Sequence, residues 1–308
     1  MLESGRRVII VFGDLNMKIK IKAPAKINLG LEILGKLPDG YHEVDFIMQT
    51  VGLYDYVTVE LTENKEINIT CNKKIDCDIQ NNIAYKAAEV FFEHTNKKSG
   101  GINIHIEKNI PISAGLAGGS SNGAAIFVAL DKIFGTNLEL SELMKLGAKI
   151  GSDIPFCMLG STARAKDTGV DLVPISPMPD CYVLLVKPDL SVSTKEAYEK
   201  ADKLGSKTGA KIDMLMQCIE NQDLLGIGKN LFNRFEDIIF QNIIKDIKSS
   251  LLNKGALGAS MSGSGPTVFG IFDNESAANK CFNYMKSVYK ETFLCRPTNH
   301  GAIIVCDE

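Results

Sequence analysis

The stretch "PISAGLAGGSSNGAA", residues 111–125, consists almost entirely of small residues that cannot fill a hydrophobic core. Before it, "INIHIE" (102–107) has an apolar residue at every second position, which predicts a strand with one buried face. After it, "AAIFVALDKIF" (124–134) repeats apolar residues at helical spacing. The small residues therefore form a strand-to-helix loop, with Ser120 and Ser121 at the expected helix start.

This loop has the chemistry of an anion site. Gly115, Gly118 and Gly119 allow a ligand to approach the backbone closely, and a helix N-terminus carries unpaired N–H groups and partial positive charge. Phosphate is the usual occupant of such a site. The alternative is a flexible connector capped by Ser120 or Ser121. Neither common phosphate motif is present, because the loop lacks the lysine of G-x-x-x-x-G-K-[ST] and the spacing of G-x-G-x-x-G.

Composition excludes several classes of protein. The 308 residues carry a net charge of −3, and the 34 basic residues form no block, which argues against nucleic acid binding. The eight cysteines include no C-x-x-C pair, so we expect free thiols in a reducing cytoplasm rather than zinc or disulfides. No run approaches the roughly 18 apolar residues of a membrane span. We predict a cytoplasmic protein without membrane contacts.

Strand and helix patterns alternate irregularly along the chain, which indicates an α+β fold in two lobes. Residues 1–16 contain only the short apolar run "VIIVF" and are expected to be an N-terminal appendage. The Pro-rich stretch "VPISPMPD" (173–180) is the best candidate linker. We therefore predict lobes over residues 17–172 and 173–308.

Three further stretches contain polar residues in settings that favour a binding site. "APAKINLGLEILGK" (23–36) places Lys26 and Asn28 on an early strand, and the following "PDGYH" predicts a hairpin turn at Asp39-Gly40 that delivers Tyr41 and His42. "GSDIPF" (151–156) places Asp153 directly after a helix end. "GASMSGSGPTVFGIF" (258–272) is a second Gly/Ser loop, and it leads into a strand.

Taken in this order, these stretches and the opening loop resemble the three motifs of the galacto-, homoserine, mevalonate and phosphomevalonate (GHMP) kinase superfamily. "DGYHEVDFIMQTV" and "GSDIPF" are most similar to members that act on a cytidylylated methylerythritol. The resemblance runs from Met17 to about Phe272. It implies a ribosomal-protein-S5-domain-2-like N-terminal lobe and a ferredoxin-like α/β sandwich as the C-terminal lobe.

The resemblance also implies a reaction: transfer of the γ-phosphoryl group of ATP, with Mg²⁺, to the 2-hydroxyl of the methylerythritol unit in the non-mevalonate isoprenoid route. Asp153 is then the base and Lys26 the cation beside it. A lysine within about 4–6 Å would keep the aspartate ionised and stabilise charge on the reacting oxygens.

The expected binding residues follow from the same resemblance. The ATP phosphates would be held by Pro111, Ile112, Ser113, Ala114, Gly115, Leu116, Ala117, Gly118, Gly119, Ser120 and Ser121, with Ser120 or Ser121 a candidate near Mg²⁺. Asn82 and Ile83 would lie near the adenine. Asn28, Tyr41, His42 and Tyr198 would bind the substrate, with the two tyrosines stacking on the cytosine. Ser113 and Ala114 stand where many relatives have glycine, and Asn122 where an acidic residue is frequent.

Other functions remain open on the sequence. Homoserine or mevalonate kinase activity is the nearest alternative, and the "DGYH" segment argues against it because those substrates have no base to bind. A non-catalytic metabolite-binding relative would be expected to lack Lys26 or Asp153. A dinucleotide-binding oxidoreductase would need the missing G-x-G-x-x-G. We expect a monomer or homodimer with a small-molecule substrate.

Overall fold

The computed structural model describes residues 17–38, 40–74, 78–97, 101–202, 210–238 and 242–305. The predicted appendage 1–16 and Asp39 of the predicted turn lie outside these ranges. The helices are α1 (Ile83–Thr95), α2 (Gly118–Phe134), α3 (Leu140–Ala148), α4 (Asp153–Leu159), α5 (Thr194–Ala201), α6 (Ala210–Glu220), α7 (Leu224–Asn230), α8 (Asn242–Asn253) and α9 (Glu275–Val288), with 3₁₀ turns η1 (Ile79–Asn81) and η2 (Arg234–Asp237).

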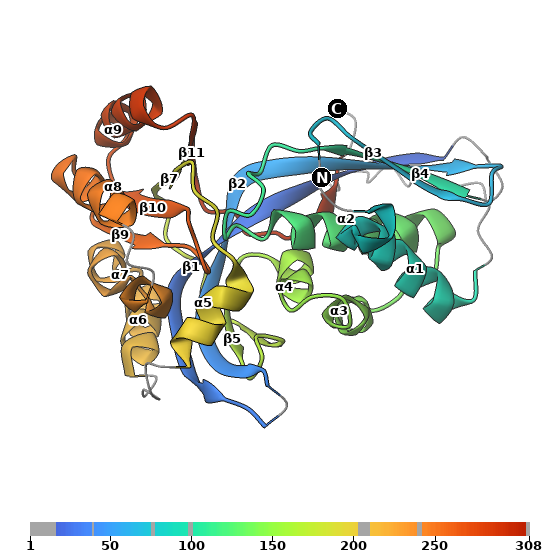
Figure 1. Cartoon of the computed structure of the whole chain (residues 1–308), viewed down its shortest axis with the longest axis horizontal. Coiled ribbons are helices and arrows are strands. Elements are labelled where there is room, and N and C mark those ends of the chain that lie inside the picture. Colours follow the sequence, from blue (N-terminus) through green and yellow to red (C-terminus); the bar gives the residue numbers. More distant parts are fainter. Residues whose placement is uncertain are drawn as a thin grey trace, which may run out of the picture.

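Two sheets organise these helices into two lobes (Figure 1). The first sheet has the order β12-β1-β2-β4-β3, with β5 pairing β2 and β6, and β8 pairing β1. Its strands are β1 (Lys18–Lys36), β2 (His42–Thr62), β3 (Ile67–Cys71), β4 (Gly101–Glu107), β5 (Thr162–Lys166), β6 (Asp171–Pro174), β8 (Phe232–Asn233) and β12 (Ile303–Ile304). The second sheet has the order β11-β7-β10-β9 and consists of β7 (Tyr182–Lys187), β9 (Gly258–Met261), β10 (Val268–Phe272) and β11 (Glu291–Cys295).

The strand and helix on either side of the Gly-rich loop are confirmed. Ile102, Ile104 and Ile106 are all at most 1% exposed on β4, and they pack with buried residues of α1 and α2 in one cluster. Burying each such side chain contributes about 1.5–3 kcal/mol. Helix α2 begins at Gly118 rather than at the predicted Ser120 or Ser121, because Ala117 takes the left-handed conformation that turns the chain into the helix.

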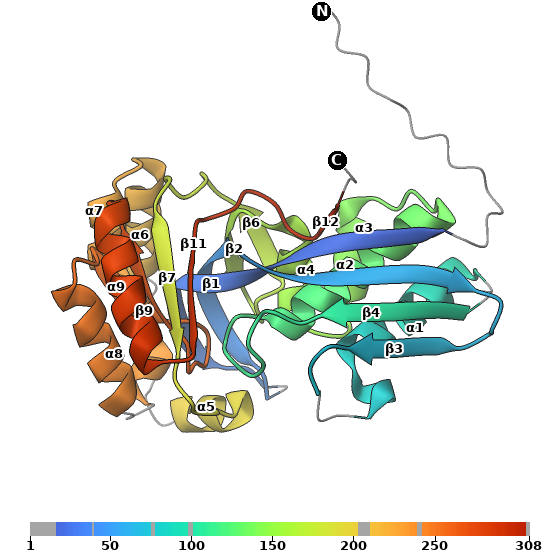
Figure 2. The ribbon, with the colours of Figure 1, turned by 90° about the horizontal axis from the view of Figure 1, so that it is seen from above.

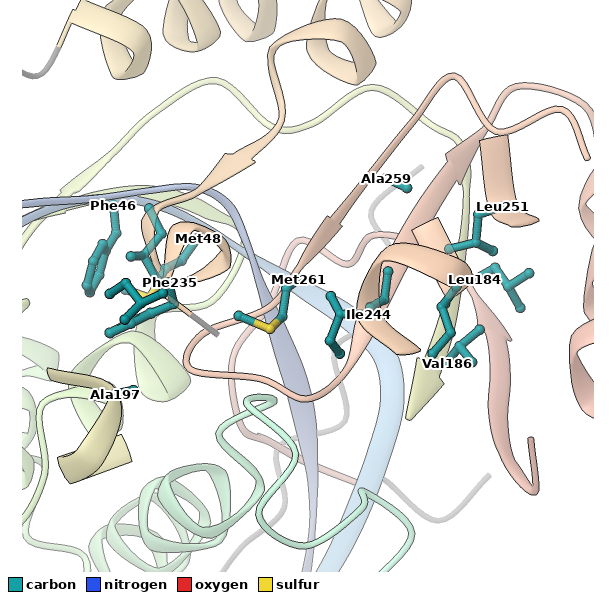
Figure 3. Packing of buried hydrophobic residues seen from close by; sticks show 14 of the residues in the cluster. Phe46, Met48, Leu184, Val186, Ala197, Phe235, Ile244, Leu251, Ala259 and Met261 are labelled. Carbon is teal, nitrogen blue, oxygen red and sulfur yellow. The ribbon is translucent and has the colours of Figure 1, made fainter. Parts of the chain in front are cut away.

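The two long strands β1 and β2 connect the lobes. They pair as an antiparallel hairpin from Lys18↔Glu60 to Lys36↔His42, with three shifts of register along it, and Figure 2 shows this ribbon running from the helices α1–α4 to the second sheet. Near its tip, Phe46 and Met48 of β2 join a buried cluster with Leu184 and Val186 of β7 (Figure 3). The hairpin thus contributes residues to three buried hydrophobic clusters.

The predicted lobe boundary at residue 173 lies within packed structure. Strand β6 ends at Pro174 and pairs with β5 of the first sheet, and the backbone N–H of Met178 donates to the Thr162 hydroxyl. The chain also returns to the first sheet at its end, where β12 pairs with β1. The division into 17–172 and 173–308 stays a prediction.

Candidate functional site

A pocket of about 700 Å³ lies where the first sheet, α2, α4, α5 and the loop between β9 and β10 meet. The predicted site residues that line it are Lys26, Asn28, Asn82, Ile83, Pro111, Ile112, Ser113, Ala114, Gly115, Ala117, Gly118, Gly119, Asp153 and Tyr198. Leu116, Ser120, Ser121, Tyr41 and His42 are not among its lining residues. Most of the residues predicted from separate motifs therefore face a single cavity.

The Gly-rich loop has the backbone of an anion site. Ser113, Gly115 and Ala117 all have positive φ, at 52°, 74° and 53°, so the loop is folded tightly rather than extended. The N-cap residue Ala117 has no side chain that could accept from the first N–H groups of α2. Those groups lie beside the pocket, so they can bind a ligand with negatively charged oxygens.

The two serines after the loop have different surroundings. Ser121 is fully buried, and its hydroxyl donates to the Pro24 carbonyl at 2.7 Å, which joins α2 to β1. Ser120 is half-buried. Of the two candidates near a metal, Ser120 is therefore the one whose hydroxyl is not already held in the core.

Lys26, Asn28 and Asp153 meet in the pocket. Lys26 is 4% exposed; its ammonium donates to Asn28 Oδ1 at 2.7 Å and lies 3.7 Å from Asp153 Oδ2. Lys26 and Asn28 share one face of β1 because alternate side chains point the same way, while Ala25, Ile27 and Leu29 are buried on the other face.

Within the described part of the chain, the side-chain amide of Asn28 is hydrogen-bonded through its oxygen and not through its nitrogen. Its Oδ1 also accepts from the backbone N–H of Gly263, at 3.0 Å. Its Nδ2 is buried and has no hydrogen-bond partner among the described residues. Leaving a buried donor unpaired is costly, so this amide is suited to a ligand oxygen.

Asp153 is the first residue of α4, a helix that the sequence analysis missed. Pro155 lies in its first turn, where backbone N–H groups have no intrahelical partner and proline is tolerated. The position leaves the Asp153 side chain 34% exposed toward the pocket. Burial raises the pKa of the Tyr198 phenol above its usual value, and the nearby negative charge of Asp153 raises it further.

The hairpin and α5 bring His42 and Tyr198 together. The two rings are 4.8 Å apart between centroids, and Asp202 at the end of α5 accepts from both His42 Nε2 (2.6 Å) and Lys36 Nζ (2.5 Å). Tyr198 also packs edge-on against Phe235, at 4.9 Å. Tyr41 lies in a different setting, 68% exposed at the hairpin tip.

Asn82 and Ile83 lie at the start of α1. Asn82 Oδ1 caps the helix by accepting from the Ala84 N–H at 2.9 Å. Ile83 lines the pocket together with Ile106 and Ile112, so part of the cavity wall is apolar.

The loop between β9 and β10 also contributes to the site, although none of its residues was predicted to. Gly263, Ser264 and Gly265 line the pocket. The loop contacts the Gly-rich loop directly: Ser262 Oγ donates to the Gly115 carbonyl at 2.9 Å. A Cβ at Gly115 would lie 2.1 Å from the Ser262 carbonyl oxygen, so only glycine fits there. The second Gly/Ser run was the signal that could have placed this loop in the site.

Models of two known domains match the chain. "GHMP kinases N terminal domain" matches residues 82–161, and "GHMP kinases C terminal" matches residues 215–291. The first match includes the Gly-rich loop and Asp153, and the second includes the loop between β9 and β10.

Similar proteins match over nearly the whole chain. A protein of Lachnoclostridium phytofermentans named 4-diphosphocytidyl-2-C-methyl-D-erythritol kinase is 45% identical over 282 residues, covering 90% of this chain and 97% of that protein. A crystal structure of 4-(cytidine 5'-diphospho)-2C-methyl-D-erythritol kinase has a TM-score of 0.77 at 26% identity, covering 91% of this chain and 99% of that one. Homoserine kinase from Cytophaga hutchinsonii has the same fold, with a TM-score of 0.77 at 20% identity, covering 96% of this chain and 100% of that one.

Proposed function

Because the chain belongs to the 4-diphosphocytidyl-2-C-methyl-D-erythritol kinase family of the GHMP superfamily, we propose that Lys26 and Asp153 are its catalytic residues. The protein is an ATP-dependent small-molecule kinase of non-mevalonate isoprenoid biosynthesis, and it has the predicted two-lobed α+β fold. It phosphorylates the 2-hydroxyl of the cytidylylated methylerythritol. The observation that carries our assignment of the reacting centre is the 3.7 Å contact between Lys26 and Asp153 inside the pocket.

The reaction needs a place for the hydroxyl proton. The proton passes to the Asp153 carboxylate as the alcohol oxygen bonds to the γ-phosphorus and the bond to the β-phosphate oxygen breaks, which releases ADP. Lys26 offsets the negative charge that builds on the reacting oxygens. The unpaired Nδ2 of Asn28 donates to an oxygen of the alcohol and orients it.

The nucleotide is held by the loop and the helix start. The uncapped N–H groups of α2 and the tight turns at Ser113 and Gly115 bind the phosphates of ATP. The apolar end at Ile83, Ile106 and Ile112 holds the adenine, with Asn82 beside it. This arrangement accounts for the many small residues of the loop, which leave room for the phosphates.

Mg²⁺ is the expected metal. Among the residues that the structure describes, no group of three His, Cys, Asp or Glu side chains could hold a metal by itself. Mg²⁺ suits such a site because it usually keeps several waters and binds through substrate phosphates and one or two protein oxygens. When bound, it would neutralise charge on the phosphates; of Ser120 and Ser121, Ser120 would contribute the oxygen, because the Ser121 hydroxyl donates to the Pro24 carbonyl.

The cytidine end of the substrate is assigned to the hairpin and α5. Tyr198 lines the pocket and contacts His42, and Asp202 holds His42 and Lys36 against α5. We propose that His42 hydrogen-bonds the cytosine and that Tyr41 and Tyr198 stack on it. Such stacking contributes roughly 1–3 kcal/mol per base.

We also propose a cellular location, an oligomeric state and a division into lobes for the enzyme. We expect a cytoplasmic monomer or homodimer, with residues 17–172 and 173–308 as its lobes and 1–16 as an appendage. None of the helices in the described ranges is long and apolar enough to cross a membrane.

A comparison of three candidate substrates tests the function. The purified chain is assayed for ADP release with ATP and Mg²⁺ in the presence of the cytidylylated alcohol, homoserine or mevalonate. We expect turnover with the cytidylylated alcohol alone, a 2-phosphate product by ³¹P NMR, and loss of activity in EDTA that Mg²⁺ restores. Turnover with homoserine or mevalonate, or phosphorylation at another hydroxyl, would contradict the proposal.

A further inference from the structure

A buried carboxylate lies beneath the Gly-rich loop, outside the reacting centre. Asp55 of β2 is fully buried and accepts hydrogen bonds from Lys108 Nζ, Asn122 Nδ2 and the backbone N–H groups of Asn109 and Ile110. A buried charge is retained only when it is paired and hydrogen-bonded, and this one has donors at both oxygens. These donors lie at the two ends of the loop: residues 108–110 come just before it, and Asn122 comes just after it.

At the beginning of the loop, the Asp55 carboxylate accepts backbone hydrogen bonds that a neighbouring strand would otherwise accept. The β2–β4 ladder ends at Tyr56↔Glu107, and the chain then leaves the sheet. Oδ1 of Asp55 accepts from the next free N–H groups, those of Asn109 at 2.7 Å and Ile110 at 2.8 Å. The carboxylate therefore fixes the direction in which the chain enters the loop at Pro111.

At the end of the loop, the same carboxylate holds helix α2. Oδ2 of Asp55 accepts from Asn122 Nδ2 at 2.9 Å and forms an ion pair with Lys108. Asn122 is 4% exposed, lies in the early turns of α2 and lines the pocket. One side chain thus connects the residues just before the loop with the helix just after it.

The ion pair also places a positive charge under the helix start. Lys108 is 4% exposed and lines the pocket, and a Cβ at Gly118 would lie 2.6 Å from its Nζ. The loop itself contains no lysine between Pro111 and Ser121. The structure brings one to the first residue of α2 from the strand before the loop.

We propose that Asp55 is a positioning residue for nucleotide binding: it fixes both ends of the Gly-rich loop and holds the Lys108 ammonium at the N-terminus of α2. This inference rests on the proposed role of the loop in binding the phosphates of ATP. Asp55 itself does not line the pocket, so it acts through the backbone of residues 109–110, through Asn122 and through Lys108.

Asp55→Asn tests the role of the charge with little change in size. The new amide can still accept from the two backbone N–H groups, but its NH₂ group then faces the donors of Lys108 and Asn122. We expect the Kd for ADP and the KM for ATP to rise on the order of 10-fold or more, as for other small misplacements of binding groups. The KM for the cytidylylated alcohol should change by no more than about 2-fold, because that substrate is held by other residues.

Exchanging the two partners provides a rescue. Asn122→Asp alone places two carboxylates against each other and should also weaken ADP binding. The double variant Asp55→Asn/Asn122→Asp restores one amide, one carboxylate and the charge that pairs Lys108. We expect it to bind ADP more tightly than either single variant.

Asp45→Asn is the matched control. Asp45 is a second buried acid of β2, 4% exposed and bound by Arg164 at 2.8 and 2.6 Å, but it does not line the pocket. The Asp45→Asn variant should have a lower melting temperature but the same Kd for ADP.

Calorimetric titration with ADP, in the absence of the alcohol and well below the melting temperature, separates the outcomes. An unchanged Kd in folded Asp55→Asn, or a loss equal to that of Asp45→Asn, would overturn the inference while leaving the kinase function intact. A failure of the unaltered protein to bind ADP would overturn both the inference and the proposed role of the loop.

Discussion

The Lys26 ammonium and the Asp153 carboxylate lie 3.7 Å apart, at the point where strand β1 and helix α4 meet. The Lys26 side chain is 5% exposed and that of Asp153 is 34% exposed, so the pair is shielded from water on one side and open to the pocket on the other. An ion pair in this setting can act on a bound ligand as well as stabilise the fold.

Asp153→Asn should remove the proposed base and leave binding intact. We expect kcat to fall by roughly 10²–10⁴-fold, the usual cost of losing a general base. The KM for both substrates should stay within a few-fold, because the amide keeps the size and part of the hydrogen bonding. Steady-state kinetics on the folded variant test this. If Asp153 only stabilises the start of α4, stability would fall by about 0.3–1 kcal/mol and turnover would remain nearly normal.

Lys26→Met should also lower kcat, because it removes the cation that we propose stabilises charge on the reacting oxygens. If Lys26 and Asp153 act as one unit, the double variant will be less impaired than the product of the two single effects. Rate losses that multiply fully in the double variant would contradict a shared role. Circular dichroism of each variant provides the control for folding.

The two tyrosines should have the same effect on substrate binding but different effects on stability. Tyr41→Ala and Tyr198→Ala should each raise the KM for the cytidylylated alcohol by roughly 10-fold, through the loss of about 1–3 kcal/mol of stacking. Only Tyr198→Ala should lower the melting temperature clearly, because Tyr198 packs on His42 and Phe235 while Tyr41 is 68% exposed. Tyr198→Phe is the control that keeps the ring. An equal rise in the KM for ATP would show that the tyrosines do not bind the cytosine.

The contact of the hairpin with α5 should depend on pH through Asp202. A hydrogen bond from Lys36, and then one from His42, hold the pKa of this carboxyl below its usual value. Its stabilising contribution is therefore present above about pH 3.9, the unfolded-state pKa, and is lost as the pH falls through the lowered folded-state pKa. Asp202→Asn should melt at a lower temperature than the unaltered protein at pH 6, and the difference should shrink toward pH 3. A difference that does not change over this range would rule out the carboxylate charge as its cause.

Deleting residues 1–16 should leave both kcat and the melting temperature nearly unchanged, because Met17 directly precedes the first strand, β1. Parallel assays of the full chain and the shortened chain test this. A clear drop in either quantity would show that "VIIVF" packs on the body of the enzyme.

Much of the local structure could be predicted because the periodicity of apolar residues reports it directly. The sequence predicted the strand β4, the helix α2 and the early strand that carries Lys26 and Asn28, and each is present. Helix α4 was missed because it is short and contains Pro155, which usually marks a helix end but is tolerated in a first turn. The start of α2 was placed at the serines because Ala117 gave no sign of its left-handed turn.

By itself, the sequence determined several of the elements and the family, since each element and each motif depends on residues close together in the chain. Only the tertiary structure decided which distant residues meet. It brought Gly263 to Asn28 and Asp55 to both ends of the Gly-rich loop. These contacts depend on the register of β1 on β2 and on how the two lobes close around the pocket. A local pattern holds no information on such long-range register, because the same strand or helix would form in any arrangement that buried its apolar face.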